Sequence, residues 1–92
     1  MILHQILSGK TQTLTDLSTV INPHDGLILI GDGCYQISNR KLTAMTSNIF
    51  ARTQDVDCRG LANLAQEIDL KLINDAEWVG LTLRFNKVVS WK

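Results

Sequence analysis

The sequence has no excess charge of either sign, because nine Lys and Arg residues balance nine Asp and Glu residues. A chain without net charge has no overall field to attract nucleic acid or an anionic membrane, so we expect direct binding to neither. The longest apolar runs are far shorter than the roughly 20 residues that cross a bilayer. Residues 1–10 also lack the basic start and long apolar stretch of a signal peptide. These absences predict a cytoplasmic protein.

Residues for metal, cofactor and nucleophile chemistry are also scarce. The chain has two cysteines, Cys34 and Cys58, and two histidines, His4 and His24, and their spacing matches no common metal-binding motif. Without an export signal, the cysteines are expected to be reduced thiols. The turn at residues 31–33 is neither a dinucleotide-binding fingerprint nor a P-loop. We therefore expect no metal and no cofactor.

The length of 92 residues suits one domain and leaves no room for a second. No internal repeat, low-complexity tract or linker divides the chain, so residues 1–92 are treated as a single domain. A domain of this size buries only about 60 to 65% of the surface of its unfolded chain. Association with other subunits would therefore add stability.

Residues 26–33, GLILIGDG, form the stretch around which the rest of the chain can be placed. Four consecutive large aliphatic residues run into a Gly-Asp-Gly turn, which is typical of a strand buried on both faces of a parallel sheet. Strand-like and helix-like patterns alternate along the rest of the chain. This predicts an α/β fold, with a mostly parallel sheet of about four strands and helices on both faces. The expected strands lie near residues 2–7, 27–31, 48–53 and 68–73.

Apolar residues recur at helical spacing in two segments that precede the last expected helix. The first covers residues 11–22 and ends before Pro23, because a proline disfavours helical backbone in the residue before it. The second begins at Asp57 and places Cys58 on an apolar face, which predicts that Cys58 is a buried core thiol. Residues 34–45 are weakly patterned and are expected to form a short helix and a loop.

The last expected helix runs from residue 75 to about residue 89 and carries two separate apolar stripes. The broader stripe should face the sheet, and it comprises Trp78, Leu81, Phe85, Val88 and Val89. Val79 and Leu83 lie outside it, on a second stripe for which a monomer has no obvious use. We single them out as candidate interface residues. Scattered apolar surface residues are also normal, so that alternative stays open.

Cys34 is the one candidate for catalytic chemistry in the chain. It follows the carboxyl end of the central strand, where open α/β sheets place their sites, and a helix N-terminus there would lower the pKa of its thiol. We therefore expect Cys34 to be at least partly accessible. The alternative is an ordinary small hydrophobic residue, as lone cysteines usually are. For His4, we favour a buried strand histidine with a backbone partner over a functional group.

Several short motifs together resemble those of a known family. The opening Met1-Ile2-Leu3-His4 is similar to the family's short first strand, which contains Leu-His. The stretch LILIGDG (27–33) is similar to its buried strand, which ends in an Asp-Gly turn. The stretch ARTQDVDCRGL (51–61) is similar to its strand-to-helix segment. The most specific part is the end, where Asp75, Trp78, Val79, Leu81 and KVVSW (87–91) are similar to a C-terminal helix that finishes in a tryptophan. The chain thus resembles the TusB/DsrH family of sulfur-relay proteins, which have a DsrE/DsrF/DsrH-like fold.

The resemblance implies a subunit of a sulfur-transfer assembly. TusB-like chains associate with TusC-like and TusD-like chains of similar fold in a heterohexamer, which passes persulfide sulfur toward 2-thiolation of the wobble uridine in certain tRNAs. DsrH-like chains serve sulfur oxidation and carry a cysteine near the end of the first helix, where this chain has Thr19-Val20-Ile21. This difference favours the TusB-like role.

The transferring cysteine belongs to the TusD-like partner, so the resemblance assigns no catalytic residue to this chain. We expect a structural, non-catalytic subunit that forms homo-oligomers when isolated. Two other functions stay open. One is a persulfide-carrying sulfurtransferase that acts through Cys34, and the other is a homo-oligomeric module that binds a small molecule, although the chain lacks a phosphate loop.

Overall fold

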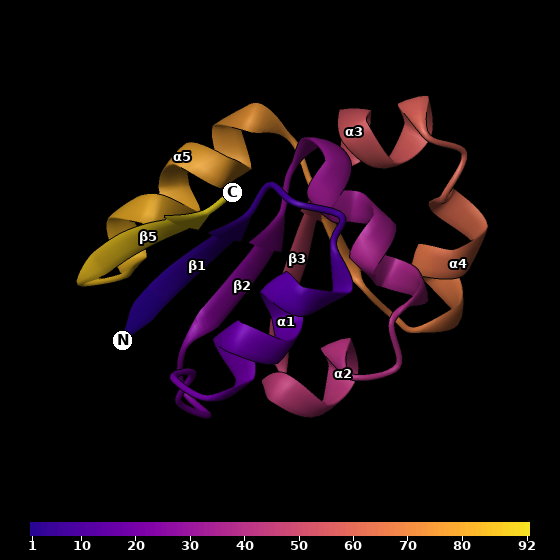
Figure 1. Ribbon diagram of the computed structural model, residues 1–92. Helices are drawn as coiled ribbons and strands as arrows, with labels where there is room; N and C mark the ends of the chain where they lie inside the picture. Colours follow the sequence, from indigo (N-terminus) through magenta and orange to yellow (C-terminus); the bar gives the residue numbers. More distant parts are fainter.

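A parallel sheet of five strands runs through the computed structural model, which describes residues 1–92 (Figure 1). The strand order is β4-β3-β2-β1-β5, and every neighbouring pair is parallel. The strands are β1 (Ile2–Ile6), β2 (Gly26–Leu29), β3 (Asn48–Arg52), β4 (Lys71–Ile73) and β5 (Lys87–Trp91). The predicted α/β class is confirmed, with one strand more than expected.

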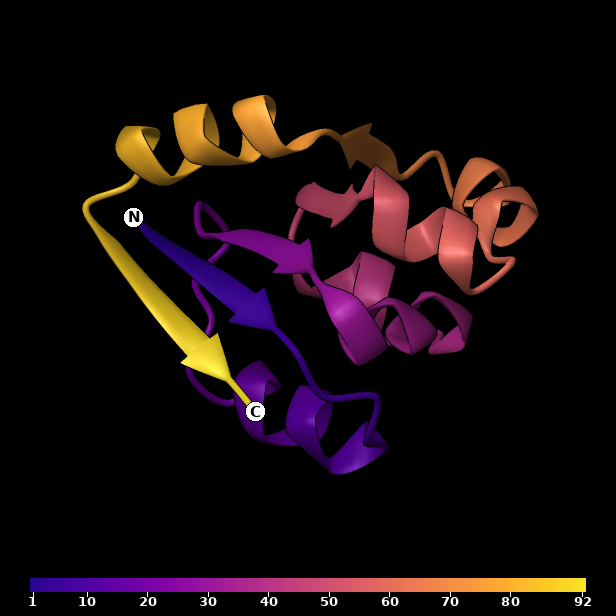
Figure 2. The ribbon, with the colours of Figure 1, turned by 90° about the horizontal axis from the view of Figure 1, so that it is seen from above.

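Helices cover both faces of the sheet, as predicted, but they do so unequally. One face packs against α1 (Thr11–Ser18), the 3-10 helix η1 (Gly31–Ser38), α2 (Leu42–Met45), α3 (Thr53–Cys58) and α4 (Ala62–Glu67). The other face packs against α5 (Asp75–Arg84) alone. Figure 2 shows α5 and α1 on opposite sides of the sheet. None of these helices has the length and apolar character needed to span a membrane.

Strand β2 divides the core into two parts, and this explains its unbroken aliphatic sequence. All four of its residues are buried. Leu27 and Leu29 belong to the larger cluster, whereas Ile28 belongs to the smaller cluster beneath α5. Since successive side chains of a strand point to opposite faces, a central strand needs an apolar residue at every position.

The predicted last helix is too long, because its final residues form β5 instead. Helix α5 ends at Arg84, and Phe85 already has an extended backbone with φ −102° and ψ 153°. Residues 87–91 then pair in parallel with β1. The β-branched residues Val88 and Val89 favour a strand, and pairing along β1 outweighs the apolar spacing that had suggested a helix.

The helix predicted to begin at Asp57 is in fact two helices, α3 and α4. Gly60 separates them with φ +66°, a left-handed conformation that ends a helix and that glycine adopts without strain. The break removes the common apolar face on which Cys58 was expected. Cys58 is exposed.

The remaining element bounds differ less from the prediction. Strands β1, β2 and β3 lie within two residues of the expected ranges. Helix α1 ends at Ser18 rather than near residue 22. Strand β4 begins only at Lys71, because Asp69 has a φ of 55° and the amide of Leu70 bonds to the carbonyl of Ala65 at the end of α4. The weakly patterned residues 34–45 lie in η1 and α2 and the short connection between them.

Candidate functional site at the carboxyl edge of the sheet

Two glycines in the turn after β2 fix the position of Cys34. Gly31 opens η1 with a φ of +56°. Gly33 packs so closely against β1 that an added Cβ would lie 1.8 Å from the carbonyl oxygen of Ile6, so only glycine fits there. The turn therefore folds η1 back over the sheet and places Cys34 in the core.

Cys34 is fully buried, with a relative exposure of 0%, and its Sγ lies 3.6 Å from the carbonyl oxygen of Leu29. Burial is the main cause that raises the pKa of Cys34 to about 11; Asp55 adds to the rise, while Arg59 and Arg52 oppose it. The thiol is thus protonated at neutral pH and shielded from solvent. The prediction of a partly accessible Cys34 is wrong, because the η1 turn carries this residue inward.

A line of five alternating charges lies above Cys34, along the carboxyl ends of β2, β3 and β4. Its order is Asp32, Arg59, Asp55, Arg52 and Asp75. The successive nitrogen-to-oxygen distances are 3.0, 3.7, 3.1 and 2.7 Å. Two of these contacts are local, since Arg52 and Asp55 are three positions apart and Asp55 and Arg59 are four positions apart. The Asp32–Arg59 and Arg52–Asp75 pairs join segments that follow different strands, and local spacing gives no sign of them.

Both arginines of this line are engaged by carboxylates. The hydrogen bond to Asp75 is the main cause that raises the pKa of Arg52, and the same bond lowers the pKa of Asp75. The hydrogen bond to Asp32 likewise raises the pKa of Arg59. The Arg59 guanidinium also lies 5.7 Å from the centre of the Tyr35 ring. Neither arginine is free to hold an anionic substrate.

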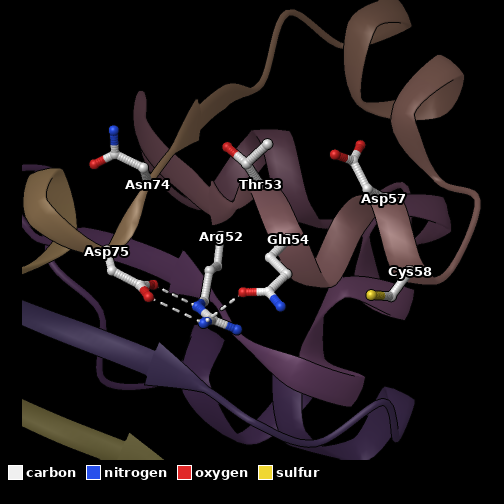
Figure 3. Close-up of a pocket in the computed structure, with 7 residues that line it drawn as sticks. All are labelled: Arg52, Thr53, Gln54, Asp57, Cys58, Asn74 and Asp75. Carbon is white, nitrogen blue, oxygen red and sulfur yellow. Dashed lines mark hydrogen bonds and ion pairs between the residues drawn. The ribbon is translucent and has the colours of Figure 1, made fainter.

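Cys58 lies on the wall of an open pocket of about 350 Å³ at this edge. The other lining residues are polar: Arg52, Thr53, Gln54, Asp57, Asn74 and Asp75. Figure 3 shows the guanidinium of Arg52 between Gln54 and Asp75, with Cys58 apart from them at the end of α3. The prediction of a buried Cys58 is therefore wrong, and the two cysteines have the reverse of their expected exposures.

A second polar cluster lies inside the molecule and joins both ends of the chain. Nε2 of His4 lies 3.1 Å from a carboxylate oxygen of Asp25, and the indole N–H of Trp91 donates to Nδ1 of His4 over 3.1 Å. Asp25 also accepts from the backbone amides of Ile2 and Asn22. His4 is buried and partnered, as predicted, but its partners are side chains rather than backbone. The sequence alone gave no sign that Asp25 and Trp91 would meet it.

The hydrogen bonds fix the protonation pattern of this cluster. Because an indole N–H can only donate, Nδ1 of His4 must accept, and the imidazole proton sits on Nε2 and points to Asp25. Burial by itself would raise the pKa of Asp25, but the hydrogen bonds from Ile2, Asn22 and His4 outweigh it and hold the pKa below its usual value. A catalytic histidine needs a free nitrogen for a nucleophile, and here Trp91 occupies that position. The cluster is structural.

The same edge carries no cluster of metal ligands and one further open pocket. No group of three or more His, Cys, Asp or Glu side chains is placed to hold a metal ion. A second open pocket, of about 410 Å³, lies beyond the ends of β1 and β5 between Lys10, Tyr35 and Lys92.

The two candidate interface residues lie away from this edge, on the outer face of α5. Val79 has a relative exposure of 60% and Leu83 one of 81%. Leu81 on the inner face is buried, and Trp78 and Phe85 pack beside it against the smaller core cluster. The division of the helix into two stripes holds, except that Val88 and Val89 belong to β5. Whether another subunit covers Val79 and Leu83 stays a prediction.

Comparison with known proteins supports both the fold and the family. A solved structure of a conserved protein of unknown function from Bacteroides thetaiotaomicron is similar, with a TM-score of 0.70 and 13% identity over 97% of this chain and 93% of that chain. At this identity the likeness shows the fold alone. No curated protein matches the sequence. The model of the DsrH-like protein family matches residues 8–88. The chain therefore belongs to the DsrH-like family, which is associated with sulfur relay.

Proposed function

We propose that this chain is a non-catalytic, structural subunit of a cytoplasmic sulfur-relay complex that passes persulfide sulfur toward 2-thiolation of the tRNA wobble uridine. Its partners are TusC-like and TusD-like subunits of similar fold in a heterohexamer. It uses no metal or cofactor and touches neither membrane nor nucleic acid directly. The observation that carries the proposal is the burial of Cys34.

A sulfur carrier needs a cysteine that its donor can reach and that ionises near neutral pH. Cys34 meets neither condition, since it is enclosed by the core and its pKa is raised to about 11. This argues against the alternative of a persulfide-carrying enzyme that acts through Cys34. Cys58 is exposed and does meet the first condition. In this proposal the sulfur is carried by a cysteine of another subunit and not by Cys58.

The charge line at the carboxyl edge supports an indirect role toward tRNA. Proteins that bind nucleic acid hold phosphates with free lysines and arginines. Here Arg52 and Arg59 are paired with Asp32, Asp55 and Asp75. Together with the balanced net charge, this favours a subunit that supports the complex while another chain contacts the tRNA.

Association with other subunits is proposed to use the outer face of α5, where Val79 and Leu83 are exposed. Burying both side chains would contribute on the order of 3 to 6 kcal/mol by the usual side-chain scale. The isolated chain is expected to form homo-oligomers through the same face. Replacing both residues by Ser should weaken association without unfolding the chain, since neither side chain is in the core.

Two experiments test the proposal. A tagged chain purified from its native cell should bring down two like-folded subunits, and recovery of the chain alone contradicts an assembly role. Incubation with a cysteine desulfurase and labelled cysteine, followed by intact mass, should show no added sulfur on Cys34. A sulfur gain that disappears in Cys34→Ser but persists in Cys58→Ser would support the carrier instead.

A further inference from the structure

The outer face of α5 carries a continuous stripe of small and apolar residues. It consists of Ala76, Val79, Gly80 and Leu83, all of them exposed. Their spacing of three, four and seven positions from Ala76 places them on one side of a helix. This outer stripe is opposite the inner face, where Leu81 is buried.

Gly80 has no reason within the monomer to be a glycine. A Cβ added to it would meet no atom within 4 Å, and its φ is not in the left-handed region. Glycine within a helix is also less favourable than alanine. The absence of a side chain therefore serves the outside of the molecule, where it lets another backbone approach the helix closely.

The charges beside the stripe indicate what that other backbone is. Glu77 and Arg84 line the same groove as Gly80, between α5 and strands β3 and β4. They are seven positions apart, on one flank of the stripe. Arg84, in the last turn of α5, makes no hydrogen bond or ion pair within the chain, whereas Arg52 and Arg59 at the sheet edge are both paired. Glu77 uses one carboxylate oxygen to close the capping box with Asn74. The second oxygen remains available.

A two-fold axis beside Gly80 would make this flank complementary to itself. If a second α5 packs antiparallel across the stripe, Glu77 of each copy lies opposite Arg84 of the other copy, which gives two equivalent ion pairs. The antiparallel helix dipoles also attract each other. A two-fold contact requires such a self-complementary surface.

We infer that the outer stripe of α5 docks against α5 of a second copy of this chain, antiparallel, with Gly80 at the crossing and Glu77 facing Arg84 on both sides. The contact is a property of the isolated chain. The inference rests on the proposed function, since it specifies how the expected homo-oligomer forms when the other subunits that use the same face are absent.

The test uses two charge reversals of the full chain, Glu77→Lys and Arg84→Glu, and sedimentation analysis over a range of concentrations. In a dimer formed by either variant with itself, residues 77 and 84 of the two copies carry like charges and repel each other. The dissociation constant of that dimer should therefore rise by roughly tenfold or more. When the two variants are mixed, every facing pair is again of opposite sign, and the dimer should return. The matched controls Glu67→Lys and Arg40→Glu reverse exposed charges elsewhere and should leave the wild-type dissociation constant unchanged.

Mixing separates a pairing role from a structural one. A variant that was only destabilised, for instance because Glu77→Lys opens the capping box, would not recover its dimer on mixing. Gly80→Gln gives a second readout, because it should keep the melting temperature of the monomer or raise it while weakening the dimer.

Three results would overturn the inference: a wild-type chain that stays monomeric at high concentration, single reversals that dimerise like the wild type, or a mixture that stays monomeric. The first result would also contradict the homo-oligomer expected of the isolated chain. None of them contradicts the proposed role in the sulfur relay, which depends on recovery of the other subunits from the native cell.

Discussion

The indole N–H of Trp91 donates a 3.1 Å hydrogen bond to Nδ1 of His4, although 87 positions separate the two residues in the chain. The bond joins β5 to β1, and the opposite nitrogen of His4 reaches Asp25 at the entry to β2. One buried cluster thus ties together three neighbouring strands. It gives the histidine a structural role and explains how an edge strand at the end of the chain stays paired.

Replacing Trp91 by Phe removes the donor but keeps an aromatic ring. The buried Nδ1 of His4 then loses its partner, and we expect a loss of about 1 to 3 kcal/mol in the free energy of unfolding. Urea titration measures this loss. Trp78→Phe is the matched control, since its partner Gln5 is only partly buried and can bind water instead. Equal losses in both variants would contradict the role of the cluster.

The pKa of Asp25 predicts a specific acid sensitivity. Because hydrogen bonds hold this pKa below its ordinary value of 3.8, the folded state binds fewer protons than the unfolded state at acidic pH. The contribution of Asp25 is therefore complete well above pH 4 and is lost as the pH falls through the lowered pKa. Asp25→Asn should be less stable at pH 7 and should lose less stability between about pH 5 and pH 2. Parallel pH profiles for the two proteins would rule this out.

The two cysteines should differ sharply in reactivity. At neutral pH a thiol reagent should modify exposed Cys58 quickly and buried Cys34 only at the rate of unfolding. Because the pKa of Cys34 is raised from 9.0 to about 11, the folded state keeps a proton that the unfolded state releases, so this thiol lowers stability as the pH rises above 9. Intact mass against time measures both rates, with Cys58→Ser isolating the signal of Cys34. Rapid labelling of that variant would contradict the buried position.

Substitution by alanine should change the stability of the chain in opposite directions at two glycines. Gly80→Ala adds a methyl group in open space on a helix and should stabilise the chain by about 0.5 to 1 kcal/mol. Gly33→Ala drives a Cβ into the backbone of β1 at Ile6 and should destabilise it strongly. Thermal unfolding of both variants at low protein concentration gives the comparison. If Gly33→Ala were neutral, the tight turn that buries Cys34 would be in doubt.

The sequence predicted the sheet best where local pattern and tertiary environment agree. The aliphatic run from Leu27 to Ile30 can be satisfied only between two apolar layers, and β2 lies there. The prediction from the sequence was wrong where local pattern and tertiary environment conflict. Val88 and Val89 fit a helical stripe as well as a strand, and only pairing with β1 decides between these options.

The site was harder to predict because it depends on turns and on contacts between distant loops. A single left-handed residue, Gly60, ends α3 and leaves Cys58 exposed, whereas the close contact of Gly33 with β1 buries Cys34. The spacing of residues around either cysteine does not predict that Cys58 is exposed and Cys34 buried. The charge line likewise exists only because three parallel strands end at one edge.

The most direct test of the structural role is a complementation assay. Cells that lack this chain would receive either the wild type or the double variant Cys34→Ala, Cys58→Ala, and the 2-thiouridine content of their tRNA would be measured by nucleoside mass spectrometry. We predict that loss of the chain lowers 2-thiolation and that the cysteine-free variant restores it to the wild-type level, because no sulfur passes through this subunit. A variant that folds and joins the complex but fails to restore 2-thiolation would contradict the account, as would unchanged 2-thiolation in cells without the chain.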